Sequence, residues 1–192
     1  MKNNIEVEIC TFSLESCLNA QLAGASRVEL CSGMYDGGTT PSAAMIRMAR
    51  EKLSIQLYVM IRPRGGDFLY SDLEFEMMKE DIRFAKACRA DGVVLGILNA
   101  DGSVDVRRTR ELVELAAPLK VTFHRAIDMT RDMEEALEGI IEAGCYRILT
   151  SGGRNTVNEG MERIKALVKQ ERGRVQIMAG SGVKAANAST SK

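Results

Sequence analysis

The sequence predicts an α/β fold in which parallel strands alternate with helices and close into a (β/α)8 barrel. Strand-like apolar alternation and helical periodicity take turns along the whole chain. A pattern of helix end, glycine turn and next strand recurs at residues 23–28 and 143–148, and more weakly at 89–93. The first strand is followed by Cys-Thr-Phe-Ser rather than Gly-x-Gly-x-x-Gly, which argues against the rival, a doubly wound open sheet.

Seven strands are expected in one domain over residues 1–192, because no linker or low-complexity tract interrupts the chain. Their starts are expected near Ile5, Arg27, Gln56, Gly92, Lys120, Arg147 and Arg174. Only residues 180–192 follow the seventh strand, whereas a crossover alone needs at least about 10–12 residues. We therefore expect the eighth βα unit to be missing or incomplete in this sequence.

Four helix starts are indicated by capping residues. Thr40 precedes Pro41, and proline suits the first position of a helix. The other three starts have the spacing of a capping box: Ser71 with Glu74, Asp132 with Glu135, and Thr156 with Glu159.

The overall composition excludes several classes of partner. The chain has 26 basic and 26 acidic residues, so it lacks the excess of basic charge that nucleic-acid binding requires. No apolar run approaches the roughly 18 residues that cross a bilayer, and no leader is recognisable after Met1. The five cysteines are widely spread without a Cys-x-x-Cys pair, which favours a reducing, cytoplasmic location over a disulfide framework.

The strand alternation predicts which side chains point into the barrel. If the apolar positions face the helices, the alternate positions face the barrel axis. The inward set is unusually polar for a barrel core and comprises Glu8, Cys10, Glu29, Cys31, Met60, Arg62, His124 and Met178. Neighbouring parallel strands lie about 4.8 Å apart, so Cys10 and Cys31 are expected to approach each other.

Three interpretations of this set stay open. Two thiolates, with Met60, Met178 or His124 nearby, would form a soft metal site for Cu(I) or zinc. Alternatively, Glu8, Glu29, His124 and Asp128 would form a catalytic constellation of acids and bases. The third interpretation is a buried ion-pair network, in which Arg62 compensates the two glutamates and the cysteines only fill space.

Loops that follow the strands carry further candidate groups. Residues 61–70 form a charged, glycine-containing loop between a strand and a helix, with Arg62 and Arg64 as candidate anion-binding side chains. Glycine turns after the sixth and seventh strands could cradle a phosphate through backbone N–H groups. The candidate anion-binding residues are Arg62, Arg64, Arg125, Ser151, Gly152 and Gly180.

The same residues resemble the copper homeostasis protein CutC family. The resemblance runs from about Ile5 to Asn187, and its most specific motif is Arg-Pro-Arg-Gly-Gly-Asp-Phe at residues 62–68. The matching blocks are residues 6–10, 27–32, 36–42, 60–70, 123–126 and 149–153. Residues 183–187 are similar to the start of the family's next helix, and residues 189–192 to the end of its eighth strand.

The resemblance implies a cytoplasmic, TIM-type (β/α)8 barrel that forms dimers or tetramers and takes part in copper homeostasis. The family's proposed copper ligands correspond to Cys10 and Cys31. The alternative is a TIM-barrel lyase, isomerase or hydrolase acting on a small anionic or phosphorylated metabolite. In that case Arg62 and Arg64 would bind the anion, and His124 with Glu8 or Glu29 would move protons. A third hypothesis, an interaction module, predicts an exposed apolar patch.

Overall fold

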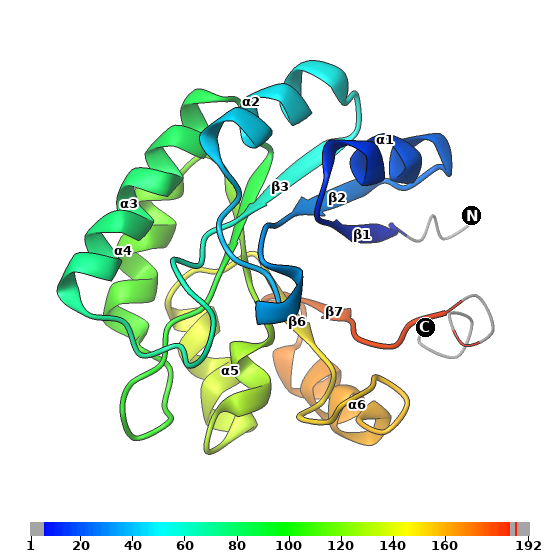
Figure 1. The fold of residues 1–192 in the computed structure, drawn as a ribbon. Coiled ribbons are helices and arrows are strands. Elements are labelled where there is room, and N and C mark those ends of the chain that lie inside the picture. Colours follow the sequence, from blue (N-terminus) through cyan, green and yellow to red (C-terminus); the bar gives the residue numbers. More distant parts are fainter. Residues whose placement is uncertain (1–5, 185–186, 188–192) are drawn as a thin grey trace. The chain divides into compact units, whose positions relative to one another are not determined.

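The structure is a computed structural model that describes residues 6–184 and 187. It divides into two compact units, which are described separately (Figure 1). Unit one comprises Met1–Asp67, Ser71–Val94 and Leu115–Leu119, and unit two comprises Phe68–Tyr70, Leu95–Glu114 and Lys120–Lys192. The expectation of a single domain is not tested by this division and stays a prediction.

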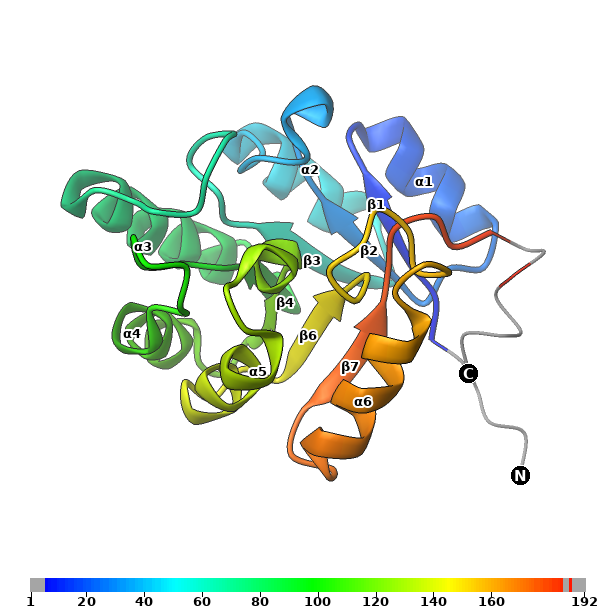
Figure 2. The same cartoon turned by 90° about the horizontal axis from the view of Figure 1, so that it is seen from below.

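Unit one is built on parallel strands with helices on one face. The strands pair in chain order. Their bounds are β1 Glu8–Thr11, β2 Arg27–Leu30, β3 Gln56–Met60 and β4 Gly92–Leu95. The last residue of β4, Leu95, belongs to unit two. The helices are α1 Leu14–Leu22, α2 Ala43–Lys52 and α3 Asp72–Ala87, with a short 3₁₀ helix, η1, at Met34–Asp36. In Figures 1 and 2, α1 and α2 cover the same face of β1, β2 and β3.

The helix starts of unit one follow their capping residues, with one correction. Ser71 and Glu74 form the expected capping box of α3. Helix α2, however, is capped by Ser42 rather than Thr40. The reason is that Thr40 is engaged elsewhere: its N–H donates to the carbonyl of Arg62, and its hydroxyl accepts the N–H of Arg62.

Unit two repeats the same alternation. Strands β5 Lys120–Phe123, β6 Arg147–Thr150 and β7 Gln176–Ala179 run parallel in chain order. The helices are α5 Met133–Glu142 and α6 Met161–Glu171, with α4 Val106–Ala116 lying mostly in this unit and a 3₁₀ helix, η2, at Arg125–Met129. Figure 2 shows α6 lying along β7. Among the described residues the seven strands therefore alternate with six α-helices, as the sequence predicts.

Two expectations in unit two need correction or fall outside the description. Helix α5 begins after its predicted cap, Asp132, but α6 begins after Gly160 rather than Thr156. Gly160 packs so closely on the carbonyl of Ser151 that no Cβ would fit there. Near the C-terminal end, the N–H of Asn187 donates to the carbonyl of Lys184. The predicted end of an eighth strand, residues 189–192, lies outside the described residues.

Residues 6–184 and 187 hold no helix that is both long enough and apolar enough to cross a membrane.

Candidate metal centre

The ladder between β1 and β2 brings two sulfurs and a carboxylate together. Cys10 stands opposite Glu29 in the parallel register, and Cys31, two residues after Glu29, directly follows β2. The Sγ atoms of Cys10 and Cys31 are 3.8 Å apart. One carboxylate oxygen of Glu29 and both sulfurs all lie within 4.8 Å of one another. In the described part of the chain, these three side chains form the group whose spacing suits a metal ion.

The three groups differ in their access to solvent. Cys10 is exposed, whereas Cys31 is fully buried and Glu29 is 4% exposed. The Oε1 atom of Glu29 is buried without a hydrogen-bond partner. An unsatisfied buried acceptor costs free energy, so this oxygen is a position where a cation would be stabilised.

Burial and neighbouring charge shift the protonation of this cluster. Burial is the main cause that raises the pKa of Glu29 well above its ordinary value, and the charges of Cys10 and Glu8 add to it. The hydrogen bond between the thiols lowers the pKa of Cys10 to about 7 and raises the pKa of Cys31. Cys10 is therefore the thiol that ionises first.

A glycine loop covers the inner sulfur. Cys31 packs with Met60 in an apolar cluster. Gly38 has a φ of +97°, and a Cβ there would lie 3.3 Å from the Sγ of Cys31 and 3.5 Å from the Cε of Met60. The loop can approach the sulfur because residue 38 has no side chain.

Arg62 fixes this loop from within unit one. Its Nη1 donates to the carbonyls of Asp36 and Gly38, at 2.6 and 2.8 Å, and its Nη2 donates to the carbonyl of Gly66 at 2.9 Å. The guanidinium, which is 5% exposed, thus binds two loops through backbone carbonyls. The neighbouring candidate, Arg64, donates its Nε to Glu74 at 2.6 Å and its Nη2 to Asp67 at 3.0 Å.

The buried ion pair of Glu8 is made with Arg27, so the prediction that Arg62 compensates Glu8 is wrong. Arg27, which is 2% exposed, donates its Nε to Glu8 and its Nη1 to Glu6. Its guanidinium also lies 5.2 Å from the ring centre of Tyr58, close enough for a cation–π contact. Arg27 was not among the predicted site residues. It lies two positions before Glu29 in β2, so the strand alternation could have placed it on the same inward face.

In unit two, Asp128 is the most fully bonded carboxylate of the predicted site. Thr150 Oγ1 donates to it at 2.5 Å, and the N–H groups of Ser151 and Gly153 donate at 3.1 and 3.0 Å. Arg125 Nε, at 2.8 Å, completes an ion pair. Burial raises the pKa of Asp128, but these hydrogen bonds outweigh it and lower the pKa below its ordinary value.

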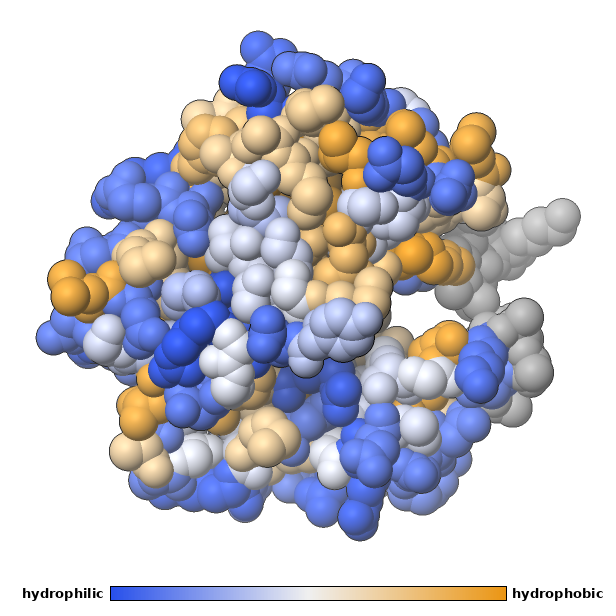
Figure 3. Space-filling view, in the orientation of Figure 1, coloured by the Kyte–Doolittle hydropathy of each residue, from blue (hydrophilic) through white to orange (hydrophobic). Residues whose placement is uncertain are grey.

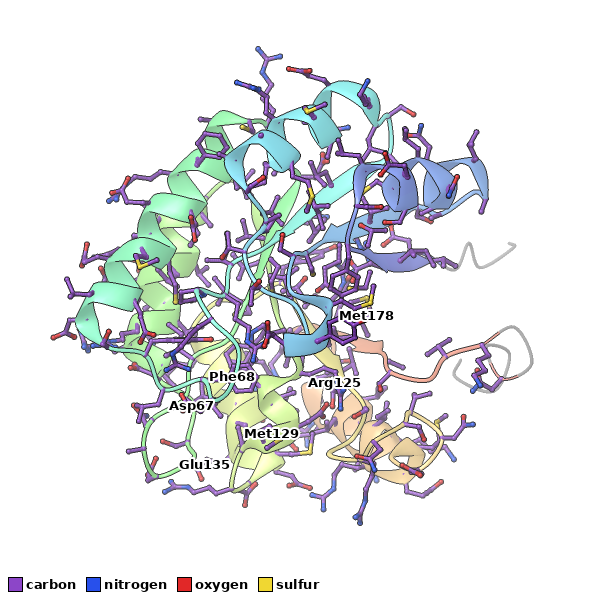
Figure 4. The ribbon with its side chains drawn as sticks, in the orientation of Figure 1. Asp67, Phe68, Arg125, Met129, Glu135 and Met178 are labelled. Carbon is purple, nitrogen blue, oxygen red and sulfur yellow. The ribbon has the colours of Figure 1, made fainter. Side chains whose placement is uncertain are left out.

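The other predicted groups of unit two also contact the protein itself. Ala126 N–H donates to Nδ1 of His124 at 3.2 Å, and the His124 ring centre lies 4.9 Å from that of Phe68. The N–H of Gly152 donates to Thr150 Oγ1, and the N–H of Gly180 to the carbonyl of Thr150. Figure 4 labels Arg125 and Met129, the first and last residues of η2.

Part of the surface of unit one is apolar. Figure 3 shows apolar residues gathered over α1 and α2. Leu22 of α1 is 83% exposed and Met48 of α2 is 38% exposed. An exposed patch is what the interaction-module hypothesis requires, and that hypothesis stays a prediction.

Comparison with known proteins assigns the family. A model of the CutC family matches residues 5–191. The chain belongs to the CutC family. A mouse relative named copper homeostasis protein cutC homolog is 49% identical over 181 residues, which make up 94% of this chain and 66% of the mouse protein. The chain thus spans about two thirds of the length of that relative.

Solved structures agree with this assignment. The crystal structure of the putative copper homeostasis protein CutC from Streptococcus agalactiae matches with a TM-score of 0.92 and 38% identity, covering 97% of this chain and 92% of that chain. An aldolase, QR15, shares the fold alone, with a TM-score of 0.72 and 17% identity over 96% of this chain and 84% of that chain. The predicted family and the TIM-barrel type of fold are confirmed.

Proposed function

We propose that this CutC chain binds Cu(I) through the thiolates of Cys10 and Cys31 and thereby takes part in copper homeostasis. The observation that carries the proposal is the sulfur pair, 3.8 Å apart, beside a buried Glu29 oxygen that has no hydrogen-bond partner. Thiolates are soft ligands that select Cu(I) or zinc over harder ions. The name of the mouse relative favours copper between these two.

The sulfur spacing also suggests the number of ligands. Metal–sulfur bonds of about 2.3 Å to both sulfurs would meet at an angle of about 110° across this gap. Such an angle is bent rather than linear, so a third ligand would complete the coordination. Glu29 is the third member of the cluster and the candidate for this position.

The surroundings of the other candidate groups support copper binding over the binding of an anionic metabolite. Arg62 and Arg64 donate to carbonyls and carboxylates of the protein, and the N–H groups of Ser151, Gly152 and Gly180 donate to acceptors in unit two. An anion would have to displace these acceptors. Copper would instead bind where a sulfur pair and an unsatisfied oxygen already meet.

Cytoplasmic location and self-association as a dimer or tetramer remain parts of the proposal. All five cysteines are free, which supports a reducing compartment such as the cytoplasm, where thiolates stay available to a metal. Light scattering of the purified chain would test the assembly.

An anaerobic Cu(I) titration against a competing chelator tests the proposal. The variants are Cys10→Ser/Cys31→Ser and, as a matched control, Cys88→Ser, which alters a partly exposed thiol outside the cluster. The wild type and the control should bind Cu(I) equally, and the double variant should bind at least about 100-fold more weakly. Equal affinity in the double variant, or tight binding of Zn²⁺ but not of Cu(I), would overturn the proposal.

A further inference from the structure

We infer that Cys10 and Cys31 are also a peroxide-reactive pair, in which Cys10 is oxidised first and Cys31 then closes a reversible disulfide. The inference rests on the proposed function in one respect: the same two sulfurs would hold Cu(I). Peroxide would thus control whether the chain can take up copper.

The two sulfurs differ in the way that a peroxide-reacting thiol and its resolving thiol differ. Cys10 is exposed and can meet an oxidant dissolved in water, whereas Cys31 is fully buried. The Sγ atoms are 3.8 Å apart, so an oxidised Cys10 would already be in contact with its partner. Solvent-accessible cysteines beside a resolving cysteine are typical of redox sensors.

The chemistry balances with a hydroperoxide as the oxidant. In the first step the sulfur of Cys10 attacks one peroxide oxygen, the O–O bond breaks, and Cys10 becomes a sulfenic acid while water or an alcohol leaves. In the second step the sulfur of Cys31 attacks the sulfur of Cys10. The S–O bond breaks, and the departing hydroxide takes the thiol proton of Cys31 to form water. Both sulfurs are oxidised, and the peroxide is reduced.

The two cysteines lie diagonally across the ladder. Cys10 stands opposite Glu29, so it reaches Cys31 diagonally rather than straight across. A disulfide is about 2.05 Å long, so the sulfurs must move nearly 2 Å closer to form it. Because Cys10 is exposed, cellular thiols could attack its sulfur and reset the pair.

The remaining cysteines do not offer the same arrangement. Cys17 and Cys145 are buried, and the Sγ of Cys17 contacts the hydroxyl of Thr11 at 3.2 Å. Cys88 is partly exposed. Among the described residues, the two sulfurs in contact are those of Cys10 and Cys31. We therefore expect peroxide to consume two of the five thiols first.

The test treats the reduced, metal-free chain with hydrogen peroxide, then counts free thiols after denaturation and measures the intact mass. The wild type and Cys88→Ser should each lose two thiols and the mass of two hydrogen atoms, within one chain. Cys31→Ser should stop at a sulfenic acid on Cys10, which a dimedone-type probe traps. Cys10→Ser should keep its Cys31 thiol. Dithiothreitol should restore both thiols in the wild type.

A wild type that keeps all its thiols, or whose lost thiols join two chains, would overturn the inference. So would oxidation of Cys31 in Cys10→Ser at the wild-type rate. A Cu(I) titration of the same samples separates this inference from the proposed function. Loss of Cu(I) binding after peroxide, regained on reduction, supports both. If the disulfide forms but the reduced chain binds no Cu(I), the redox pair stands and the proposed function fails.

Discussion

Two buried carboxylates, Glu29 in unit one and Asp128 in unit two, have opposite surroundings. Asp128 accepts hydrogen bonds from five donor groups, including the guanidinium of Arg125. Glu29 has one oxygen without any donor and lies beside the thiol of Cys10. The pKa of Asp128 is lowered by its donors, and the pKa of Glu29 is raised by its burial.

The difference separates a carboxylate that stabilises the fold from one that remains available to a ligand. Asp128 joins η2 to the loop after β6, so its charge is already neutralised by the protein. Glu29 destabilises the fold where it stands, and a cation bound by the neighbouring sulfurs would remove that cost. Although sequence reasoning assigned both residues to one catalytic set, their surroundings favour different roles.

Removing Asp128 should have the largest effect on stability. Asp128→Ala leaves several hydrogen-bond donors of the loop after β6 without their acceptor, which should lower the free energy of unfolding by about 2–3 kcal/mol. Urea denaturation measures this. Glu162→Ala is the control, because Glu162 is 88% exposed in its pair with Lys165 and should change stability by less than about 0.5 kcal/mol. A small loss at Asp128 would remove the contrast between the two carboxylates.

Replacing Glu29 should act in the opposite direction. Glu29→Leu removes an unsatisfied buried carboxylate and should raise the free energy of unfolding of the metal-free, reduced chain by about 1–2 kcal/mol. Cu(I) affinity should fall, since the third candidate ligand is gone. Denaturation and Cu(I) titration of the same sample check both outcomes. A destabilisation as large as that of Asp128→Ala would show that Glu29 also stabilises the fold.

A side chain at Gly38 should disturb the sulfur site more than the fold. Gly38→Ala places a Cβ 3.3 Å from the Sγ of Cys31 at a φ of +97°. Gly24→Ala is the matched control, because Gly24 has a φ of +85° but no atom within 4 Å of its added Cβ. Both variants should lose about 1–2 kcal/mol of stability from backbone strain. Weaker Cu(I) binding is expected in Gly38→Ala alone, and an equal loss in Gly24→Ala would contradict the assignment of the site.

The smallest effects should appear in the pH dependence of unfolding. Because the folded pKa of Asp128 is lowered, its stabilisation is complete above about pH 4 and is lost as the pH falls through its folded pKa. Glu29 has a raised folded pKa, so its native state binds more protons than the unfolded chain. The wild type should therefore lose stability relative to Glu29→Leu as the pH rises from about 4.3 to the folded pKa of Glu29. If the stability of Asp128→Ala and of Glu29→Leu changed with pH in the same way, the opposite pKa shifts of Asp128 and Glu29 would be contradicted.

Local sequence signals predicted the elements well where no distant contact competed with them. Ser71 and Asp132 cap α3 and α5 as expected, because their side chains meet N–H groups two or three residues away. Thr40 failed as a cap because Arg62, 22 residues further on, engages both its N–H and its hydroxyl. No local pattern contains the contacts of Arg62. Helix α6 begins after Gly160, although Glu159 accepts the N–H of Thr156, which is half of the predicted capping box.

For the candidate site, strand parity was enough to bring Cys10 and Cys31 together. Parity tells which face a side chain lies on but not which charged group it pairs with. Thus Glu8 pairs with Arg27 at the starts of β1 and β2, while Arg62 binds the carbonyls of two loops. The acceptors of the loop N–H groups after β6 could not be predicted either, because the carboxylate of Asp128 comes from a 3₁₀ helix more than twenty residues earlier.

The close fit between the two loops held by Arg62 restricts how this sequence can change over evolutionary time. A Cβ at Gly65 would lie 2.8 Å from Oδ1 and 2.9 Å from Cβ of Asp36, so positions 36 and 65 share a single volume. Arg62 binds the backbone carbonyl of residue 36, and this bond does not depend on the side chain there. A side chain gained at position 65 would therefore displace the one at position 36. The two positions are expected to change together, because the space between the loops holds one side chain.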